Sequence, residues 1–289
     1  MSLGHKLILQ AFLASEVMEG AGCLLSRAIP TRTLYNLDPF MLFDHITDCT
    51  GQFPDHPHRG FEVVGYLLEG HCRHEDHLGN KGETFSGGGQ WFTAGRGIVH
   101  AEKIESKSLH AVVVWVNLRS DMKFVEPAYQ MFTNSSMQRA EDWDAGIAAT
   151  ILAGSALGLT AKTITRTPSA FIDFQLQKNA VLTHPITPGW NSLIYVLEGL
   201  IEVAGQSFSP KQTIVLTVDQ PTVQVKAEKA SRFILLSGQP LKEPIVQHGP
   251  FVMNTREQIV QAYEDYQKGR NGFEGAPQWK SELFHGKKR

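Results

Sequence analysis

The 289-residue chain has no marked excess of charge of either sign and no long apolar run. It has 27 Lys and Arg residues against 29 Asp and Glu residues, so its formal net charge of -2 excludes a basic field that would hold nucleic acid through its phosphates. The apolar stretch near the start is broken by Gln10 and followed by Glu16 and Glu19. It is too short to span a bilayer and resembles a secretion signal poorly, so we expect no membrane contact and no direct binding to nucleic acid.

Cysteine is also scarce. Cys23, Cys49 and Cys72 are too few and too scattered for a disulfide framework, and no two of them have the C-x-x-C spacing of redox and metal motifs. The sequence therefore predicts a protein of a reducing, intracellular compartment.

Short β-type runs, separated by Gly, Pro and Asn turns, fill most of the chain. They recur through both halves, which favours sandwiches or barrels, and the length favours two domains. The clearest runs are Val63–Leu68, Ala111–Leu118, Leu193–Leu197, Thr213–Val218 and Phe233–Ser237.

A helix is expected only near the C-terminus. Thr255 can cap a helix over Arg256–Lys268, which ends before Gly269. Its apolar stripe predicts packing against a barrel, and the stripe consists of Ile259, Ala262, Tyr263 and Tyr266.

An internal repeat links the two halves. Residues 66–70 read YLLEG and residues 195–199 read YVLEG, each a strand that enters a turn at glycine. This indicates two copies of one β unit, with the boundary between Arg119 and Thr150.

The repeat also predicts that only the first copy binds metal. When the two copies are aligned on this anchor, His56 falls on Pro185 and His58 falls on Thr187. His184 alone lies near the expected position, so we expect the second copy to be free of metal.

Two pairs of polar side chains give the strongest functional signal. His56 and His58 form one pair and His100 and Glu102 the other, each with one residue between its members. Because side chains alternate between the faces of a strand, each pair can point into a common centre. Glu62 is an alternative carboxylate, since many related sites place a glutamate at that distance after H-x-H.

This ligand set suits iron, manganese, nickel, copper or zinc, and it contains no thiolate of a structural zinc knuckle. Four ligands on an octahedral ion leave two adjacent positions for oxygen or a chelating substrate. On tetrahedral zinc the same ligands close the site.

The residues around these ligands support the arrangement. Pro57 lacks a backbone donor, which predicts an edge strand or a bulge. Gly95 and Gly97 allow a sharp turn before His100. Arg59 and Arg96 can pair with a ligand or substrate carboxylate, or can form structural bridges.

A second histidine group is interpreted differently. His71, His74 and His77 are spaced by three, which does not keep side chains on one face of a strand. Residues 78–82, LGNKG, follow as a turn, so we expect an exposed hairpin.

The spacing His56-x-His58-x3-Glu62, followed by Gly89-x5-Gly95-x-Gly97-x2-His100, resembles the two metal motifs of the cupin superfamily, whose fold is a small jelly-roll barrel. Within that superfamily the chain resembles the pirin family over nearly its whole length. The blocks that carry this resemblance are NLDPFMLFDH at 36–45, FPDHPHRGFE at 53–62, YLLEG at 66–70, QWFTAGRGIVHAE at 90–102, WVNLRS at 115–120, TRTP at 165–168 and EPIVQHGPFVMNT at 243–255.

The resemblance implies an all-β fold of two tandem cupin jelly-roll barrels with a short C-terminal helix. Residues 1–133 would form the metal-binding barrel, and residues 134–289 a metal-free barrel that carries the helix. One mononuclear iron, Fe(II) or Fe(III), would be held by His56, His58, His100 and Glu102, with Mn, Ni, Cu or Zn as substitutes. The chain departs from the general cupin pattern, with Ile104 in place of the asparagine and Gly95 in place of the motif-two proline.

The resemblance also implies a function. Members are associated with quercetin 2,3-dioxygenase activity, in which O2 opens the ring of a flavonol. For such a reaction our own hypothesis is that Glu102 is the catalytic base that takes the 3-hydroxyl proton, if it loosens from the metal. The alternative is an iron-dependent, redox-sensing transcriptional cofactor, cytoplasmic and in eukaryotes also nuclear, that acts through a transcription-factor partner. A third interpretation is a zinc-stabilised barrel without a reaction. We expect a monomer, because the second barrel can cover surfaces that single cupins bury by dimerising.

Overall fold

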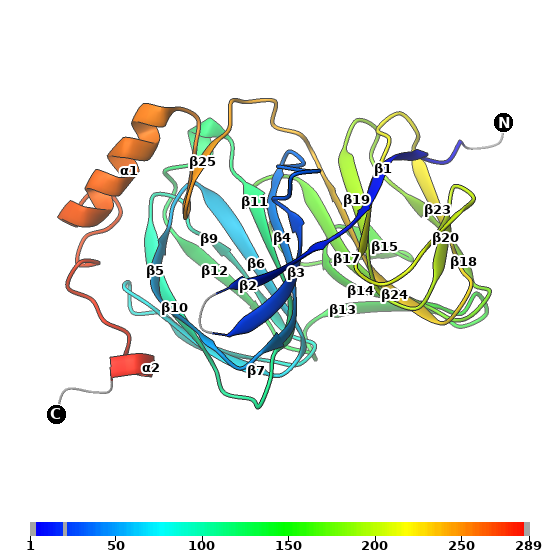
Figure 1. Cartoon of the computed structure of the whole chain (residues 1–289), viewed down its shortest axis with the longest axis horizontal. Helices are drawn as coiled ribbons and strands as arrows, with labels where there is room; N and C mark the ends of the chain where they lie inside the picture. The colour runs from blue at the N-terminus through cyan, green and yellow to red at the C-terminus, as the bar shows by residue number, and fades with distance from the viewer. Residues whose placement is uncertain (1–3, 20–21, 286–289) are drawn as a thin grey trace. The chain divides into compact units, whose positions relative to one another are not determined.

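The computed structural model describes residues 4–19 and 22–285, and these form two compact units that interleave in the sequence (Figure 1). We call one the histidine unit, because it contains His56, His58 and His100, and it consists of Glu16–Pro30, Phe40–Ser135 and Leu241–Arg289. The second unit consists of Met1–Ser15, Thr31–Pro39 and Ser136–Pro240.

The histidine unit contains a seven-stranded sheet in the order β12-β9-β6-β11-β4-β3-β2 and a four-stranded sheet in the order β5-β10-β7-β8. A two-stranded sheet pairs β25 with β26. Its elements are β2 (Ser15–Glu19), β3 (Cys23–Ile29), β4 (Phe40–Cys49), β5 (Gln52–His58), β6 (Phe61–Glu69), β7 (His71–Asp76), β8 (Lys81–Phe85), β9 (Gly89–Thr93), β10 (Ile98–Ile104), β11 (His110–Asn117), the 3-10 helix η1 (Ser120–Met122), β12 (Ala128–Phe132), β25 (Val246–His248), β26 (Phe251–Met253), α1 (Arg256–Lys268) and α2 (Glu282–His285).

The second unit repeats this plan. Its seven-stranded sheet has the order β1-β22-β19-β24-β17-β14-β13 and its four-stranded sheet the order β18-β23-β20-β21, and β15 pairs with β16. Its elements are β1 (Ile8–Leu13), β13 (Gln138–Asp142), β14 (Ile147–Ala153), β15 (Ser155–Ala156), β16 (Leu159–Thr160), β17 (Ser169–Leu176), β18 (Val181–Pro185), β19 (Asn191–Glu198), β20 (Ile201–Val203), β21 (Gln206–Phe208), β22 (Gln212–Leu216), β23 (Thr222–Ala227) and β24 (Ser231–Gly238).

The sheet orders confirm the internal repeat. The two sequence anchors lie on β6 and β19, which occupy the same place in their seven-stranded sheets. Each strand runs into a glycine with positive φ, Gly70 at 109° and Gly199 at 85°. The all-β prediction is also confirmed, since strands make up most of the elements. The five predicted strand runs lie on β6, β11, β19, β22 and β24.

The C-terminal helix differs from its expected assignment. We expected it to belong with residues 134–289, whereas α1 packs against β25 and β26 of the histidine unit (Figure 1). At the other end of the chain, β1 pairs with β22 of the second unit. The second unit thus includes the segment before Glu16 and the histidine unit the segment after Pro240. A division of domains between residues 133 and 134 stays a prediction.

The limits of α1 follow the local sequence. Thr255 Oγ1 accepts a hydrogen bond from the backbone N–H of Gln258, whose side chain returns to the N-cap backbone, a capping box. Gly269 ends the helix in the left-handed region at φ 64°. The predicted limits are therefore confirmed. Among residues 4–19 and 22–285, no helix has the length and apolar character that a membrane span needs.

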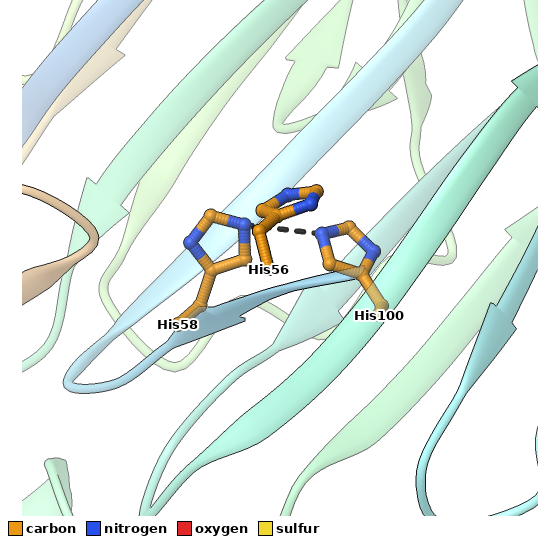
Figure 2. A group of neighbouring side chains, drawn as sticks. All are labelled: His56, His58 and His100. Atoms are coloured by element: carbon orange, nitrogen blue, oxygen red, sulfur yellow. Dashed lines mark hydrogen bonds between the residues drawn. The ribbon is translucent and has the colours of Figure 1, made fainter. Parts of the chain in front are cut away.

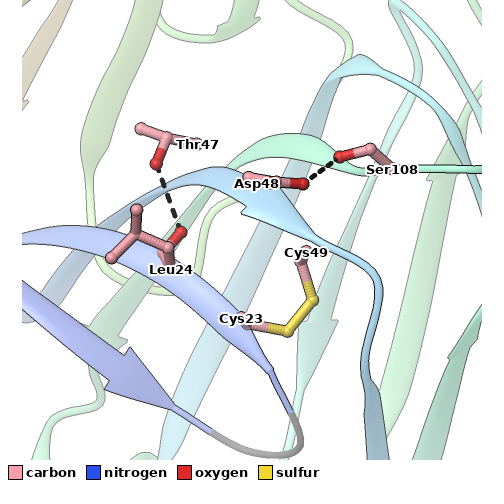
Figure 3. Close-up of a disulfide and its surroundings, with 6 residues drawn as sticks. All are labelled: Cys23, Leu24, Thr47, Asp48, Cys49 and Ser108. Atoms are coloured by element: carbon pink, nitrogen blue, oxygen red, sulfur yellow. Dashed lines mark hydrogen bonds between the residues drawn. A yellow bond between two sulfur atoms is a disulfide. The ribbon is translucent and has the colours of Figure 1, made fainter.

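Two of the three cysteines form a disulfide, although their scatter in the sequence had indicated no disulfide framework. Cys23 on β3 lies directly opposite Cys49 on β4, with Cα atoms 4.0 Å apart, and a disulfide joins them (Figure 3). The pair was missed because its members are 26 positions apart in sequence, and only the β3–β4 register reveals that they are neighbours. Cys72 is a buried free thiol.

A buried arginine ties α1 to the strand that carries two of the histidines. Arg59 directly follows β5 and is 1% exposed, and its Nη1 donates to Asp265 of α1 at 2.9 Å. Its Nε donates to the carbonyl of Arg96 at 2.6 Å and its Nη2 to the carbonyl of Asn271 at 2.7 Å. One guanidinium therefore joins the end of β5, the turn before β10 and the segment after α1.

We expect Asp265→Ala to lower the free energy of unfolding by about 3–5 kcal/mol, because it leaves the buried Arg59 charge without its partner. The matched control is Glu264→Ala, which removes an exposed carboxylate paired with Lys268 and should cost less than about 1 kcal/mol. Urea unfolding followed by circular dichroism measures both. Equal effects of the two substitutions would show that the buried pair does not hold the helix.

Candidate metal centre

Two neighbouring strands bring the three histidines together. β5 is an edge strand of its sheet and pairs antiparallel with β10, in a register that sets His56 directly opposite His100. Pro57 lies between His56 and His58, and its missing donor is tolerated at this edge. The predicted edge position is confirmed, whereas the register shifts only beyond His56, between His100 and Glu102, so the bulge lies outside the H-P-H segment.

A glycine turn delivers His100 to its strand. Gly95 has φ 50° and Gly97 has φ 147°, a region that favours glycine. Any side chain at Gly97 would meet the ring of Phe273, with the ring's Cζ 2.8 Å from the Cβ position. The turn is therefore packed as well as sharp, which fixes where β10 begins.

The three imidazoles converge on one point (Figure 2). Their candidate ligand atoms all lie within 4.8 Å of one another, and Nε2 of His58 lies 3.1 Å from Nε2 of His100. Two nitrogens that each bind one ion at about 2.1 Å, at a right angle, are about 3.0 Å apart. The spacing of these two rings fits joint binding of a metal ion.

The electrostatics of the site also fit a metal. Burial lowers the pKa of His56, and it lowers those of His58 and His100 well below the usual range, with His56 adding repulsion at both. The rings are therefore neutral, the form that binds metal. Nδ1 of His56 donates to the carbonyl of Pro54 at 2.7 Å, which leaves its Nε2 available.

Glu102 lines the same cavity but lies outside the group of three histidines. Its Oε1 accepts a hydrogen bond from Nε2 of Gln90 at 2.8 Å. Burial raises the pKa of Glu102 to about 7, and the bond from Gln90 opposes that rise. Whether Glu102 binds the metal therefore stays a prediction.

Glu62 lies on the other side of its strand. The residues of β6 that line the cavity are Val63, Gly65 and Leu67, so alternation turns Glu62 away from it. Its carboxylate accepts a hydrogen bond from the hydroxyl of Thr93 at 2.7 Å. The structure thus places Glu102, and not Glu62, in the cavity of the histidines.

The expectation of an exposed hairpin is wrong for His74. It lies on β7, is 4% exposed, and stacks on Tyr129 with ring centroids 5.4 Å apart. It lines the cavity and lies opposite Glu102 in the β7–β10 register. The missed signal was the alternating pattern of Cys72, His74 and Asp76, which marks a strand.

The histidines and Glu102 belong to a cavity of about 580 Å³ whose lining residues all lie in the histidine unit. Its walls are mainly apolar, and Phe53, Val113 and Trp115 are among them. This volume and composition are typical of small-molecule sites. The cavity is therefore large enough for a small organic molecule beside the three histidines.

The two candidate arginines do not line this cavity. Arg59 forms the buried bridge to Asp265, and Arg96 pairs at the surface with Glu126 and Glu274. These contacts support a structural role for both arginines.

In the second unit, His184 on β18 is buried and packs edge-on against Phe174 at 5.2 Å. Burial lowers its pKa to about 4. The interior around it is a cluster of aliphatic and aromatic side chains, among them Leu182, Ile186 and Val223.

Two family models match the chain. The one described as Pirin covers residues 22–116, and the one described as Pirin C-terminal cupin domain covers residues 171–272. Pirin from Homo sapiens is 44% identical over 287 residues, which cover 96% of this chain and 98% of that protein.

Solved structures agree with this assignment. A quercetin 2,3-dioxygenase from Acinetobacter baumannii is 30% identical with a TM-score of 0.86, and the match covers 92% of this chain and 98% of that one. The bacterial pirin YhhW from Escherichia coli, solved in complex with nickel(II), is 20% identical with a TM-score of 0.64, over 80% of this chain and 100% of that one, and shares the fold. The chain belongs to the pirin family and has its two cupin domains.

Proposed function

We propose that this chain is a metal-dependent dioxygenase that opens the ring of a flavonol, a quercetin 2,3-dioxygenase. The observation that carries the proposal is the convergence of His56, His58 and His100 at the wall of a largely apolar cavity. The likeness to the Acinetobacter baumannii quercetin 2,3-dioxygenase supports the same substrate class.

The metal we assign is a single iron, with Glu102 as the fourth ligand. When bound, iron supplies Lewis-acid polarisation of the flavonol oxygens and the redox chemistry of O2. Neutral imidazoles and a carboxylate are the donors such an ion takes, and Gln90 restrains the carboxylate.

The protein's own part is to bind the flavonol, exclude water and accept a proton. Trp115 and Phe53 offer aromatic surface to a planar ligand, and the apolar walls keep water from the reacting atoms. We assign Oε2 of Glu102 as the acceptor of the 3-hydroxyl proton in the state in which the carboxylate is not bound to the metal. Gln90 takes Oε1, and within the described residues no hydrogen bond to Oε2 is formed.

The regulatory alternative makes a different prediction from the same site. A redox-sensing cofactor needs Fe(II) and Fe(III) to favour different states of a partner-binding surface, whereas a dioxygenase needs turnover. Iron bound without turnover would favour the regulator, and stoichiometric zinc the structural barrel. A monomeric state and an intracellular location stay predictions.

We expect His56→Ala to lower metal affinity by at least about tenfold and to abolish O2 uptake with quercetin, because it removes one of three converging ligands. Elemental analysis and an oxygen electrode measure the two effects. The matched control is His71→Ala, which removes a partly exposed imidazole that pairs with Glu83. Full turnover by the His56 variant would rule out this metal centre.

Glu102→Gln should lower the rate of O2 uptake by about 100-fold or more, because the amide cannot accept the hydroxyl proton. The rate is to be compared per bound iron, so that loss of metal is not mistaken for loss of the base. Unchanged turnover per iron in Glu102→Ala would remove Glu102 from the reaction.

A further inference from the structure

A single row of residues crosses the cavity wall from a charged pair to the metal centre. In the seven-stranded sheet Arg27 pairs with Asp44, Asp44 with Val113, Val113 with Gly65, and Gly65 with Gln90. All five residues line the cavity. Because neighbouring strands lie about 4.8 Å apart, Asp44 and Gln90 are about 14 Å apart along the row.

One end of the row is the metal end, since Gln90 donates to Glu102. The other end is a salt bridge. Nε of Arg27 donates to Oδ1 of Asp44 at 2.8 Å and Nη2 donates to Oδ2 at 2.7 Å, while Nη2 also contacts Glu19 at 2.8 Å. Glu19 lines the cavity and its side chain is 47% exposed, so this end lies at the opening.

The pair retains capacity for a ligand. Nη1 of Arg27 donates to none of the residues that the structure describes. Each oxygen of Asp44 accepts one bond from Arg27, and a carboxylate oxygen has a second lone pair. Burial raises the pKa of Asp44 to about 6, and the bond from Arg27 opposes that rise.

The middle of the row consists of small, apolar residues. Gly65 has no side chain, and a Cβ there would come within 3.5 Å of Cγ of Gln90. Val113 is the only other residue between the two polar ends of the row. A planar ligand can therefore lie along the row without meeting a bulky side chain from it.

We propose that Arg27 and Asp44 are specificity-determining residues that bind a phenolic hydroxyl at the end of the ligand remote from the metal. The hydroxyl donates to the carboxylate of Asp44, and its oxygen accepts from Nη1 of Arg27. The site thus selects polyphenols with two separated polar ends, a chelating pair at the metal and a ring hydroxyl at the opening. This assignment rests on the proposed function, because it takes the ligand to be a flavonol.

A purely structural bridge is the competing explanation. Such a pair would stabilise the sheet and affect every ligand alike. A hydroxyl-binding pair affects only ligands that carry the hydroxyl, so a comparison of two ligands separates the explanations.

The test measures dissociation constants by fluorescence quenching, for the full chain loaded with Fe(II) under anaerobic conditions. The probes are quercetin and 3-hydroxyflavone, which keeps the chelating pair but carries no other hydroxyl. We expect Arg27→Met to weaken quercetin binding by about tenfold and to leave 3-hydroxyflavone binding unchanged. The control is Arg73→Met, which removes an exposed arginine that pairs with Glu83.

An unchanged ratio of the two dissociation constants in Arg27→Met would overturn the proposal, whether both ligands bind as before or both bind equally more weakly. So would failure of the wild-type protein to bind either flavonol. If circular dichroism shows that Arg27→Met does not fold, the double variant Arg27→Met with Asp44→Leu replaces it, because it leaves no buried charge unpaired.

The outcomes distinguish a failure of this proposal from a failure of the dioxygenase proposal. Binding that depends on Arg27, without O2 uptake in air, would refute the dioxygenase and keep the specificity site. Turnover of both flavonols, with binding unchanged in Arg27→Met, would keep the dioxygenase and refute the specificity site.

Discussion

The pairing of β5 with β10 is the constraint on which the candidate site depends. Their register sets His56 opposite His100, and alternation puts His58 and Glu102 on the same side of the sheet. Since a shift by one residue would turn these side chains to the other face, the metal centre exists only in this register. Arg59 strengthens it, because its guanidinium holds the end of β5 to the turn that starts β10.

Much of the fold could be predicted from local sequence. The limits of α1 followed from Thr255 and Gly269, and the repeat followed from two short anchors that occupy matching strands. These features depend on neighbours in sequence, which is why they were accessible. The disulfide and the packing of α1 depend on long-range pairing, and no local pattern revealed them.

The candidate site shows the same division. The H-x-H and H-x-E spacing predicted the converging histidines and placed Glu102 in their cavity, although its binding to metal stays a prediction. His74 was assigned to an exposed hairpin and Gln90 was not singled out, because only the folded cavity shows that β7 and β9 contribute to its wall. The choice between Glu62 and Glu102 could be made only when the cavity face of β6 was known.

The interleaving of the two units limits how the chain can be divided. A fragment that stops near residue 133 would lack α1 and so would leave Arg59 without Asp265. The complementary fragment would lack β1, which pairs along the edge of β22, and would expose the backbone groups of that strand. Separate expression of the two halves should therefore yield poorly soluble pieces, whereas co-expression would allow each to recover its missing segment from the other.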